Sequence, residues 1–573
     1  MIEAFLVFAL AIGLGWPLGR YLAAVMRGGP MRGDRAFELI ERPLYRLLGA
    51  DPARGMNWRG YAKAFALSNL VVGLLVWALF MTQAWLPLNP DAIPNMRWDT
   101  ALHTMVSFLT NTNQQHYSGQ AQLSYLSQMV GIVGLQVITP MMGLALVVAT
   151  LRALMGGRAV KRSADALSAS TSEADVGNYW ADVVRPTLRF MLPLCLLWSV
   201  LLTSQGVPST LQAGPVATPV DATVEMKQQK IPLGPVSPMV AAKQLGSNGG
   251  GWYGPNSATP LENPTPLSNL IELLGILLIP VSVVFMVGPL TGRRRFTGLV
   301  FGSMLLMSVL STGASLLLEQ HGPFASALME GKEVRLGGDA SALWSSITTQ
   351  VNNGSVDAMH DSLAPLTGLV SLGNMLINAI WGGVGCGLQQ FLVYLLLAVF
   401  LAGLMTGRTP ELFGRKIEAR EVRLLSLLIL LQPLVVLGFT ALTLALPQFT
   451  GGSETGISNP GFHGISQVFY EYTSAFANNG SGFEGLGDAT YWWNLTCVAV
   501  LALGRYPALI VPLAVAASLA RKRQAPEGPG SLRIETTTFA LTTIAVIVIL
   551  TLLQFMPALV LGPVADHLSL AAR

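Results

Sequence analysis

Residues 464–487 read GISQVFYEYTSAFANNGSGFEGLG, a semi-apolar segment that leads into the polar cluster Asn478, Asn479, Gly480 and Ser481. A single Asn-Gly pair indicates only a surface turn. Three other stretches have the same form, however, and each lies between two long apolar segments: WDTALHTMVSFLTNTNQQHYSG (98–119), PMVAAKQLGSNGGGWYG (238–254) and ALWSSITTQVNNGSVDAMHDS (342–362). Together the four stretches indicate a fourfold internal repeat.

The composition is that of a membrane protein. Only 12% of the 573 residues are charged, whereas soluble proteins average about 25%. Hydrophobic residues make up 51%, which excludes a disordered chain and an ordinary soluble enzyme. The three cysteines lie scattered in apolar stretches and indicate neither a disulfide framework nor a zinc site.

Apolar windows of about 20 residues predict ten transmembrane helices. Their approximate ranges are 4–26, 64–86, 123–151, 186–206, 267–289, 296–320, 364–405, 424–446, 492–519 and 536–556. The first is not a secretory signal, because it contains Glu3 and lacks a basic leading segment. We therefore expect an all-α polytopic membrane protein.

Basic residues indicate how the chain crosses the membrane. Most Lys and Arg follow the first, third, fifth, seventh and ninth spans, whereas residues 447–491 contain none. The positive-inside rule then places the basic loops in the cytoplasm and both termini outside. Arg293, Arg294 and Arg295 could also bind anionic membrane lipids, although a solvated loop is the simpler interpretation.

The repeats divide the chain into six parts. Each repeat is expected to contain a helix, a re-entrant pore helix, a polar loop and a second helix, while the first and last spans flank the four repeats. The expected parts are 1–63 (first span and basic loop), 64–151 (repeat 1), 152–292 (cytoplasmic loop and repeat 2), 293–406 (repeat 3), 407–520 (cytoplasmic loop and repeat 4) and 521–573 (last span and outer C-terminus).

The polar clusters predict a cation-selective filter. Non-helical backbone is tolerated at membrane depth where it lines a water-filled path or is buried in protein. Glycine permits positive φ, so successive carbonyls can face one axis and replace the hydration shell of an ion. The clusters hold no Asp or Glu, which favours a monovalent over a divalent cation. Asn113 stands where the other loops have Gly249, Gly354 and Gly480, so we expect only pseudo-fourfold symmetry.

The seventh span is too long for one helix, since about 41 residues would extend roughly 60 Å. Its centre contains Gly382, Gly383, Gly385 and Gly387, so we expect a break directly below the filter. The break could act as a gate or line a tunnel; close helix packing through small residues is the alternative.

Ionisable residues inside the spans need separate explanations. Arg505 lies in the middle of the ninth span, where a charge costs about 2.5–3.5 kcal/mol. It either places positive charge at the pore exit or tethers pore-loop carbonyls. Arg189, Glu272 and Glu319 lie near span ends, and we expect them to extend towards the membrane surface. His103 and His463 lie in outer loops and are assigned no chemistry.

The loops TNTN, SNGGG, NNGS and ANNGSGF resemble those of the A subunit family of the Kdp potassium transporter. Further resemblance lies in MNWRGY, PLNP, LSYLSQM, ENPTPLSN, AMHDS, FGRKIEARE, AGLMTGRTPELFG and PALVLGPVADHLSL, so it covers nearly the whole chain. It implies one chain with four pore-loop repeats, in the bacterial inner membrane, that binds K⁺ from outside. It implies transfer of K⁺ through a tunnel to a P-type ATPase B subunit, with a C subunit and a small F subunit.

By position, the resemblance assigns sixteen residues to the K⁺ filter. They are Thr110, Asn111, Thr112, Asn113, Gln115, Asn248, Gly249, Gly250, Asn352, Asn353, Gly354, Ser355, Asn478, Asn479, Gly480 and Ser481. The third loop, Val351-Asn352-Asn353-Gly354, varies relative to the family pattern.

No nucleotide chemistry is visible in the chain. It has neither a G-x-x-x-x-G-K-[ST] motif nor a DKTG motif, and its cytoplasmic loops are too short for a nucleotide domain. We therefore expect no enzyme activity from this chain alone, no bound nucleotide and no nucleic-acid partner. The alternatives are a stand-alone K⁺ or Na⁺ channel or symporter of the Trk type and, less favoured, an organic-solute transporter, which would show inverted repeats.

Overall fold

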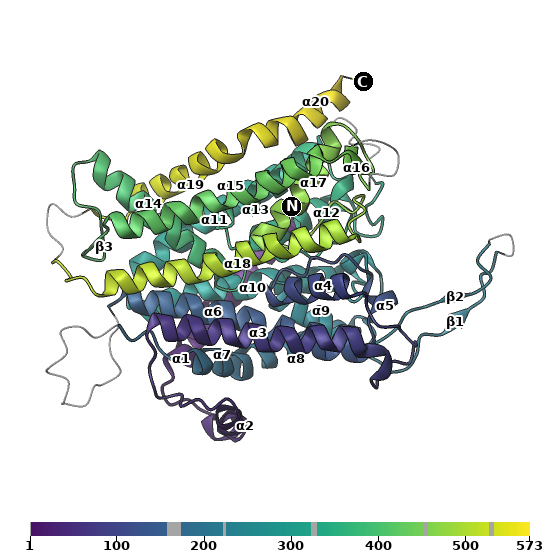
Figure 1. Ribbon diagram of the computed structural model, residues 1–573, viewed down its shortest axis with the longest axis horizontal. Coiled ribbons are helices and arrows are strands. Elements are labelled where there is room, and N and C mark those ends of the chain that lie inside the picture. The colour runs from purple at the N-terminus through teal and green to yellow at the C-terminus, as the bar shows by residue number, and fades with distance from the viewer. Residues whose placement is uncertain are drawn as a thin grey trace.

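The computed structural model describes residues 2–156, 174–221, 225–321, 329–450, 456–526 and 532–572. Long helices lie side by side along the long axis of the molecule (Figure 1). Ten helical segments of the described chain are long and apolar enough to cross a membrane, as the sequence predicts. They are α1 (Ile2–Arg27), α3 with η1 (Trp58–Thr82, Gln83–Trp85), η2 with α6 (Ser127–Val133, Gly134–Leu154), α7 with η3 and α8 (Tyr179–Pro186, Thr187–Met191, Leu192–Ser204), α10 (Pro266–Thr291), α11 (Arg294–Gln320), α14 (Cys386–Met405), α15 (Ala419–Ala445), α18 (Tyr491–Ala520) and α19 with η6 and α20 (Thr537–Leu559, Val560–Val564, Ala565–Ala571).

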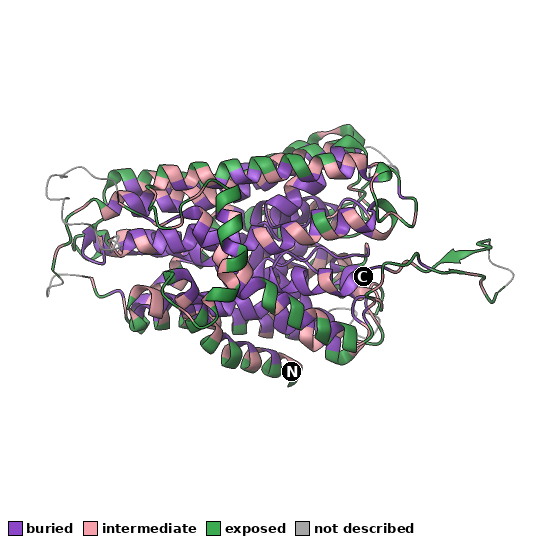
Figure 2. Cartoon of the chain, turned by 90° about the horizontal axis from the view of Figure 1, so that it is seen from below, coloured by how far each residue is buried: buried purple, intermediate pink, exposed green. Residues whose placement is uncertain are grey.

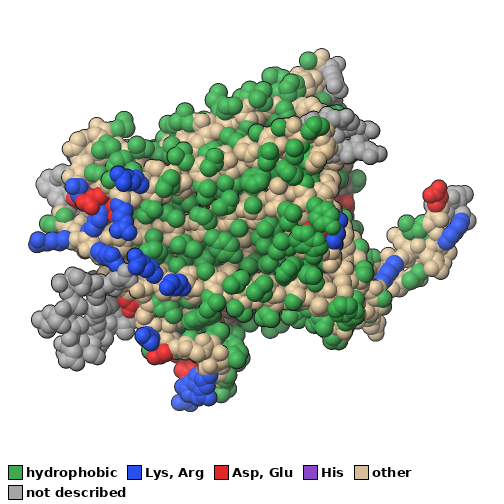
Figure 3. Space-filling model, in the orientation of Figure 1, with side chains coloured by type: hydrophobic (Ala, Val, Ile, Leu, Met, Phe, Trp, Pro, Cys, Tyr) green, Lys and Arg blue, Asp and Glu red, His purple; other side chains and the backbone are tan. Residues whose placement is uncertain are grey.

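Side-chain chemistry divides the surface into zones. Apolar side chains cover the flank of the molecule, and most of the Lys and Arg side chains in view gather at one end (Figure 3). Exposed residues follow the outer helices, whereas the central segments are buried (Figure 2). An apolar flank of this kind fits contact with lipid, because water would disfavour it.

Four shorter helices enter the molecule between the spans. They are α4 (Trp98–Leu109), α9 (Val236–Leu245), α12 (Gly338–Val351) and α17 (Phe462–Ala477). Each ends at or immediately before one of the four polar clusters, and nearly all their residues are buried. The predicted re-entrant pore helices are therefore confirmed.

The seventh span is interrupted as predicted. It consists of α13 (Pro365–Ile377) and α14, with non-helical chain between them. Gly382, Gly383 and Gly385 have φ values of 57°, 77° and 88°, which residues with a side chain rarely adopt. Glycine thus supplies the backbone freedom that the break requires.

The remaining elements connect the spans. They are α2 (Asp34–Leu47), α5 (Gly119–Gln122), η4 (Asn256–Ala258), η5 (His360–Ser362), α16 (Pro447–Thr450), the paired strands β1 (Val216–Ala217) and β2 (Gln229–Lys230), and the paired strands β3 (Glu411–Leu412) and β4 (Arg415–Lys416). The hairpin of β1 and β2 (Figure 1) projects from the end opposite the one where most Lys and Arg side chains in view gather (Figure 3). The first span packs closely on α10, since a Cβ at Gly19 would lie 2.5 Å from the Ser282 carbonyl oxygen.

Three charged residues that the sequence predicts to extend towards the membrane surface are instead buried against polar partners. Arg189 is buried and pairs with Glu41 at 2.5 Å (Nε to Oε1). Glu272 is fully buried and accepts a hydrogen bond from Gln244 at 2.7 Å, and Glu319 pairs with Lys332. Buried charges persist where such partners exist.

Candidate functional site: a ring of four pore loops

The four polar loops adopt one repeated backbone conformation. We number their filter positions from the first residue with positive φ. The first positions, Asn111, Ser247, Asn352 and Asn478, have φ of 60°, 51°, 54° and 56°. The third positions, Asn113, Gly249, Gly354 and Gly480, have φ of 57°, 74°, 88° and 106°. Left-handed residues thus alternate along each loop, which allows successive carbonyls to face one axis.

Each loop is fastened to the pore helix that precedes it. The second-position backbone amide donates to the backbone carbonyl of Ser107 in repeat 1, Lys243 in repeat 2, Thr348 in repeat 3 and Ser474 in repeat 4. In repeats 3 and 4 the third-position amide donates to the side-chain oxygen of the same residue: Gly354 to Thr348 at 2.9 Å and Gly480 to Ser474 at 3.0 Å. The helix end therefore fixes the loop conformation.

Three junctions between loops are backbone contacts at glycine. A Cβ at Gly249, Gly354 or Gly480 would lie 2.1, 2.1 or 2.0 Å from the second-position carbonyl oxygen of the next loop. Those carbonyls belong to Asn353, Asn479 and Thr112. Loops 2, 3, 4 and 1 are therefore consecutive neighbours.

The fourth junction closes the ring through side chains. Asn113 Nδ2 donates to Asn248 Oδ1 at 3.0 Å, and Asn248 Nδ2 donates to Asn111 Oδ1 at 3.2 Å. This explains why repeat 1 carries Asn113 instead of glycine: here an amide bridges the two loops. The ring is pseudo-fourfold, as expected.

Several predicted filter residues brace the ring with their side chains. Asn353 Oδ1 and Asn479 Oδ1 accept from the amides of Ser355 and Ser481 at 3.0 and 2.9 Å. Thr110 and Thr112 share a hydroxyl hydrogen bond at 2.8 Å.

Two further predicted residues contact neighbouring segments. Gln115 exchanges hydrogen bonds with the backbone of Gly251 at 3.1 and 3.0 Å. The Gly250 carbonyl accepts from Gln136 at 2.8 Å. Both residues connect repeats 1 and 2.

Some buried oxygens at the ring have no partner. Within the described chain, no hydrogen-bond partner is found for three of them: Asn113 Oδ1, Asn352 Oδ1 and Ser247 Oγ. A buried polar oxygen left unsatisfied is costly, so a water molecule or a cation is the expected partner.

Cavities lie on both sides of the ring. The larger cavity, about 430 Å³, lies on the side of the ring opposite the basic loops, and we call it the outer vestibule. It is lined by Asn113, Gly354, Gly480 and Lys332 and by the carboxylates of Glu333, Glu471, Glu484 and Asp488. The inner cavity, about 30 Å³, is lined by the four first-position residues together with Gly382, Gly383 and Arg505. Its volume holds a water molecule or an ion of similar size.

The break in the seventh span lies at this inner cavity. The amides of Trp381 and Gly382 donate to the Gln350 carbonyl at 3.1 and 2.9 Å, which ties the break to α12. Gly385 and Gly387 pack against other backbone segments. A Cβ at Gly385 would contact α6, and a Cβ at Gly387 would lie 2.1 Å from the Trp381 carbonyl oxygen. Two of the four predicted glycines therefore line the cavity, and two permit close backbone packing.

Arg505 faces the inner cavity and is only 5% exposed. Its guanidinium donates to Cys386 Sγ at 2.7 Å. This partner lies at the start of α14. Among the described residues, no hydrogen bond joins Arg505 to a pore-loop carbonyl. Arg505 therefore brings a positive charge to the inner cavity, and its role there stays a prediction.

The family model of the potassium-transporting ATPase A subunit matches residues 5–568. The chain belongs to this family. Among its A subunit relatives are proteins named potassium-transporting ATPase potassium-binding subunit from Gloeobacter violaceus (44% identical; 96% of this chain and 95% of the relative), Pseudomonas aeruginosa (43%; 98% of each) and Bacteroides thetaiotaomicron (41%; 98% of each).

One solved structure shares the fold of this A subunit family member. The potassium transporter TrkH from Vibrio parahaemolyticus superposes with a TM-score of 0.51, covering 89% of this chain and 97% of that chain. The sequences are 16% identical, so the likeness concerns the fold alone.

Sequence reasoning missed the residues that surround the ring. His116, Glu471 and Asp488 form a cluster beside the outer vestibule. Glu471 is the only acidic residue in the otherwise semi-apolar segment 464–480, and an isolated charge in a predicted pore helix was a signal that could have identified it.

Proposed function

We propose that this chain is the potassium-binding and translocating subunit of an ATP-driven, high-affinity K⁺ uptake complex. The observation that carries the proposal is the closed ring of four loops with alternating left-handed residues, which separates an outer vestibule from a small inner cavity. The names of the relatives, potassium-binding subunits, support the same ion.

In this proposal, K⁺ enters from the acidic vestibule and exchanges its hydration water for oxygens of the ring. The filter consists of the loop residues around Asn111–Asn113, Asn248–Gly250, Asn352–Ser355 and Asn478–Ser481, with Thr110 and Gln115 bracing the first loop. The ring is electrically neutral, and the C-terminal ends of the pore helices add negative potential. Such a ring suits a monovalent cation.

Active uptake requires energy that a passive ring cannot supply. We infer that ATP is hydrolysed on a P-type ATPase B subunit, and that C and small F subunits complete the complex. K⁺ passes from the inner cavity, past Gly382, Gly383 and Arg505, into a tunnel towards the B subunit. The complex lies in the bacterial inner membrane, with the basic loops in the cytoplasm and both termini outside.

A Trk-type channel or symporter is the alternative, because the fold is shared with TrkH. Family membership and 41–44% identity to A subunits favour the pump. Purification tests the choice: we expect a tightly bound subunit of ATPase size and K⁺-stimulated ATP hydrolysis that Gly249→Ala removes. Growth at low K⁺ supported by this chain without any ATPase partner would refute the proposal.

A further inference from the structure

Three side chains of the kinds that bind metal ions lie close together next to the outer vestibule and the first pore loop. His116 Nε2 lies 3.0 Å from Glu471 Oε1 and 3.8 Å from Asp488 Oδ2. The three ligand atoms lie within 4.8 Å of one another. His116 and Glu471 are buried, while the Asp488 side chain is 30% exposed. Imidazole and carboxylate groups together are the ligand set of many Zn²⁺ sites.

These distances suit one tetrahedral ion. Ligand atoms about 2.0–2.1 Å from Zn²⁺ are separated by roughly 3.3 Å in a tetrahedron. The two distances from His116 Nε2 lie on either side of that value. Small side-chain rotations would therefore bring the three atoms to one centre, with a fourth position open to the vestibule.

The imidazole of His116 is oriented by a hydrogen bond to Asn494. Asn494 Nδ2 donates to Asp99 Oδ2 at 2.8 Å, so Asn494 Oδ1 is the atom that faces His116 Nδ1, at 2.8 Å. Nδ1 must then carry the hydrogen, and Nε2 is directed at the two carboxylates. Metal-bound histidines usually donate their other ring N–H in this way.

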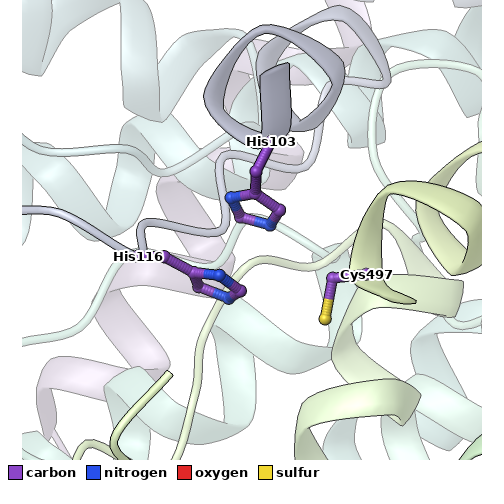
Figure 4. Close-up of side chains that lie close together, drawn as sticks. All are labelled: His103, His116 and Cys497. Atoms are coloured by element: carbon purple, nitrogen blue, oxygen red, sulfur yellow. The ribbon is translucent and has the colours of Figure 1, made fainter. Parts of the chain in front are cut away.

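A second grouping, His103, His116 and Cys497, is less suited to an ion. The two imidazole rings lie one over the other (Figure 4), with centroids 3.7 Å apart and planes at 11°. An imidazole lone pair lies in the plane of its ring, so two stacked parallel rings cannot direct lone pairs at one centre. The geometry instead selects His116 with the two carboxylates.

The cluster is accessible and negative. Glu471 and Asp488 both line the outer vestibule, so an ion could enter without crossing the filter. We propose that His116, Glu471 and Asp488 bind a divalent transition-metal ion, with Zn²⁺ the best match to this ligand set. This site goes beyond K⁺ selection, because the filter itself has no carboxylate.

Metal binding would act on the filter through Gln114. Gln114 Nε2 donates to Glu471 Oε1 at 2.5 Å, and the Gln114 carbonyl accepts from Ser107 Oγ at 2.9 Å. A metal ion at Glu471 Oε1 competes with Gln114 for the same oxygen. We therefore expect occupancy to loosen the end of the first pore loop and to slow K⁺-dependent turnover.

Isothermal titration of the purified complex with Zn²⁺, after removal of any histidine tag, tests the site directly. We expect one Zn²⁺ per chain. Asp488→Asn and, separately, Glu471→Gln should weaken binding about tenfold or more, because each removes a charged ligand. Asp488 is partly exposed, so its substitution should leave folding intact even where Glu471→Gln does not.

Two matched variants serve as controls. Glu333→Gln removes a vestibule carboxylate outside the cluster, and Cys497→Ser removes the thiol; neither should change Zn²⁺ binding. The absence of binding, equal weakening by Glu333→Gln, or loss of binding in Cys497→Ser would overturn the proposal. Titration needs no transport activity, so this result is independent of the proposed K⁺ function.

Discussion

Gly354→Ala tests the ring at the contact between loops 3 and 4. Gly354 has a φ of 88°, and a Cβ there would lie 2.1 Å from the Asn479 carbonyl oxygen. An alanine in left-handed conformation costs about 1–2 kcal/mol. In addition, a separation of about 3.0 Å requires that carbonyl to move by about 0.9 Å (3.0 − 2.1).

A displacement of this size removes one oxygen from the ring. A hydrogen bond to a charged group contributes about 1.5–3 kcal/mol, and a carbonyl–cation contact should be comparable. K⁺ affinity should therefore fall about 10- to 100-fold, since about 1.4 kcal/mol corresponds to tenfold. The assay is the K⁺ concentration that gives half-maximal ATP hydrolysis by the purified complex.

The control is Gly302→Ala, in α11. A Cβ at Gly302 would have no neighbour within 4 Å, so K⁺ affinity should not change. If Gly354→Ala assembles normally and leaves the half-maximal K⁺ concentration unchanged, the oxygens of loops 3 and 4 do not hold the ion.

Three further predictions concern charged side chains outside the four pore loops. Arg505→Gln should raise ATP-independent Rb⁺ flux into proteoliposomes about tenfold or more, because it removes a positive charge beside the inner cavity and about 1.4 kcal/mol of barrier corresponds to tenfold. Unchanged flux would exclude a barrier role. Lys243→Met should lower the free energy of unfolding by about 3–5 kcal/mol, seen as a lower Tm in detergent, because it leaves two buried glutamates without their cation. Burial lowers the pKa of His463, but hydrogen bonds to Asp361 and Asp566 outweigh this effect and raise the pKa to about 9. The charged His463 should therefore stabilise the folded protein by about 3 kcal/mol. This contribution is complete below about pH 6.5 and is lost as the pH rises through about 9. The Tm difference between the protein and His463→Gln, measured across this range, should vanish at the alkaline end.

Most of the fold was predictable because membrane insertion makes strong demands on composition. Spans need continuous apolar sequence, and basic loops mark alternate connections. The break at Gly382 and Gly383 was predictable for the same reason: the apolar stretch exceeded one bilayer. The positions of the pore loops followed from repetition, since four equal signals are stronger than one.

The polar interior was not predictable to the same degree. Arg189 pairs with Glu41 and Asp34, residues 148 and 155 positions away in the chain. Nothing local distinguishes such a pair from a charge that extends towards the membrane surface. The role of Asn113 was equally hidden, because the amide acts across a junction with Asn248 that exists only when the ring closes.

The charges around the neutral ring would oppose passive movement of K⁺ along the proposed pathway. Four carboxylates and one lysine, Lys332, line the outer vestibule, whereas Arg505 lines the small cavity on the other side of the ring. A cation in the ring is therefore attracted on the outer side and repelled on the inner side, and the low dielectric of the interior strengthens both effects. In the proposed function, this asymmetry favours occupancy of the ring from outside at low K⁺ and disfavours passive flow inward. In the proposed function, strong binding of K⁺ in the ring and low passive leak through it are then two consequences of one charge distribution.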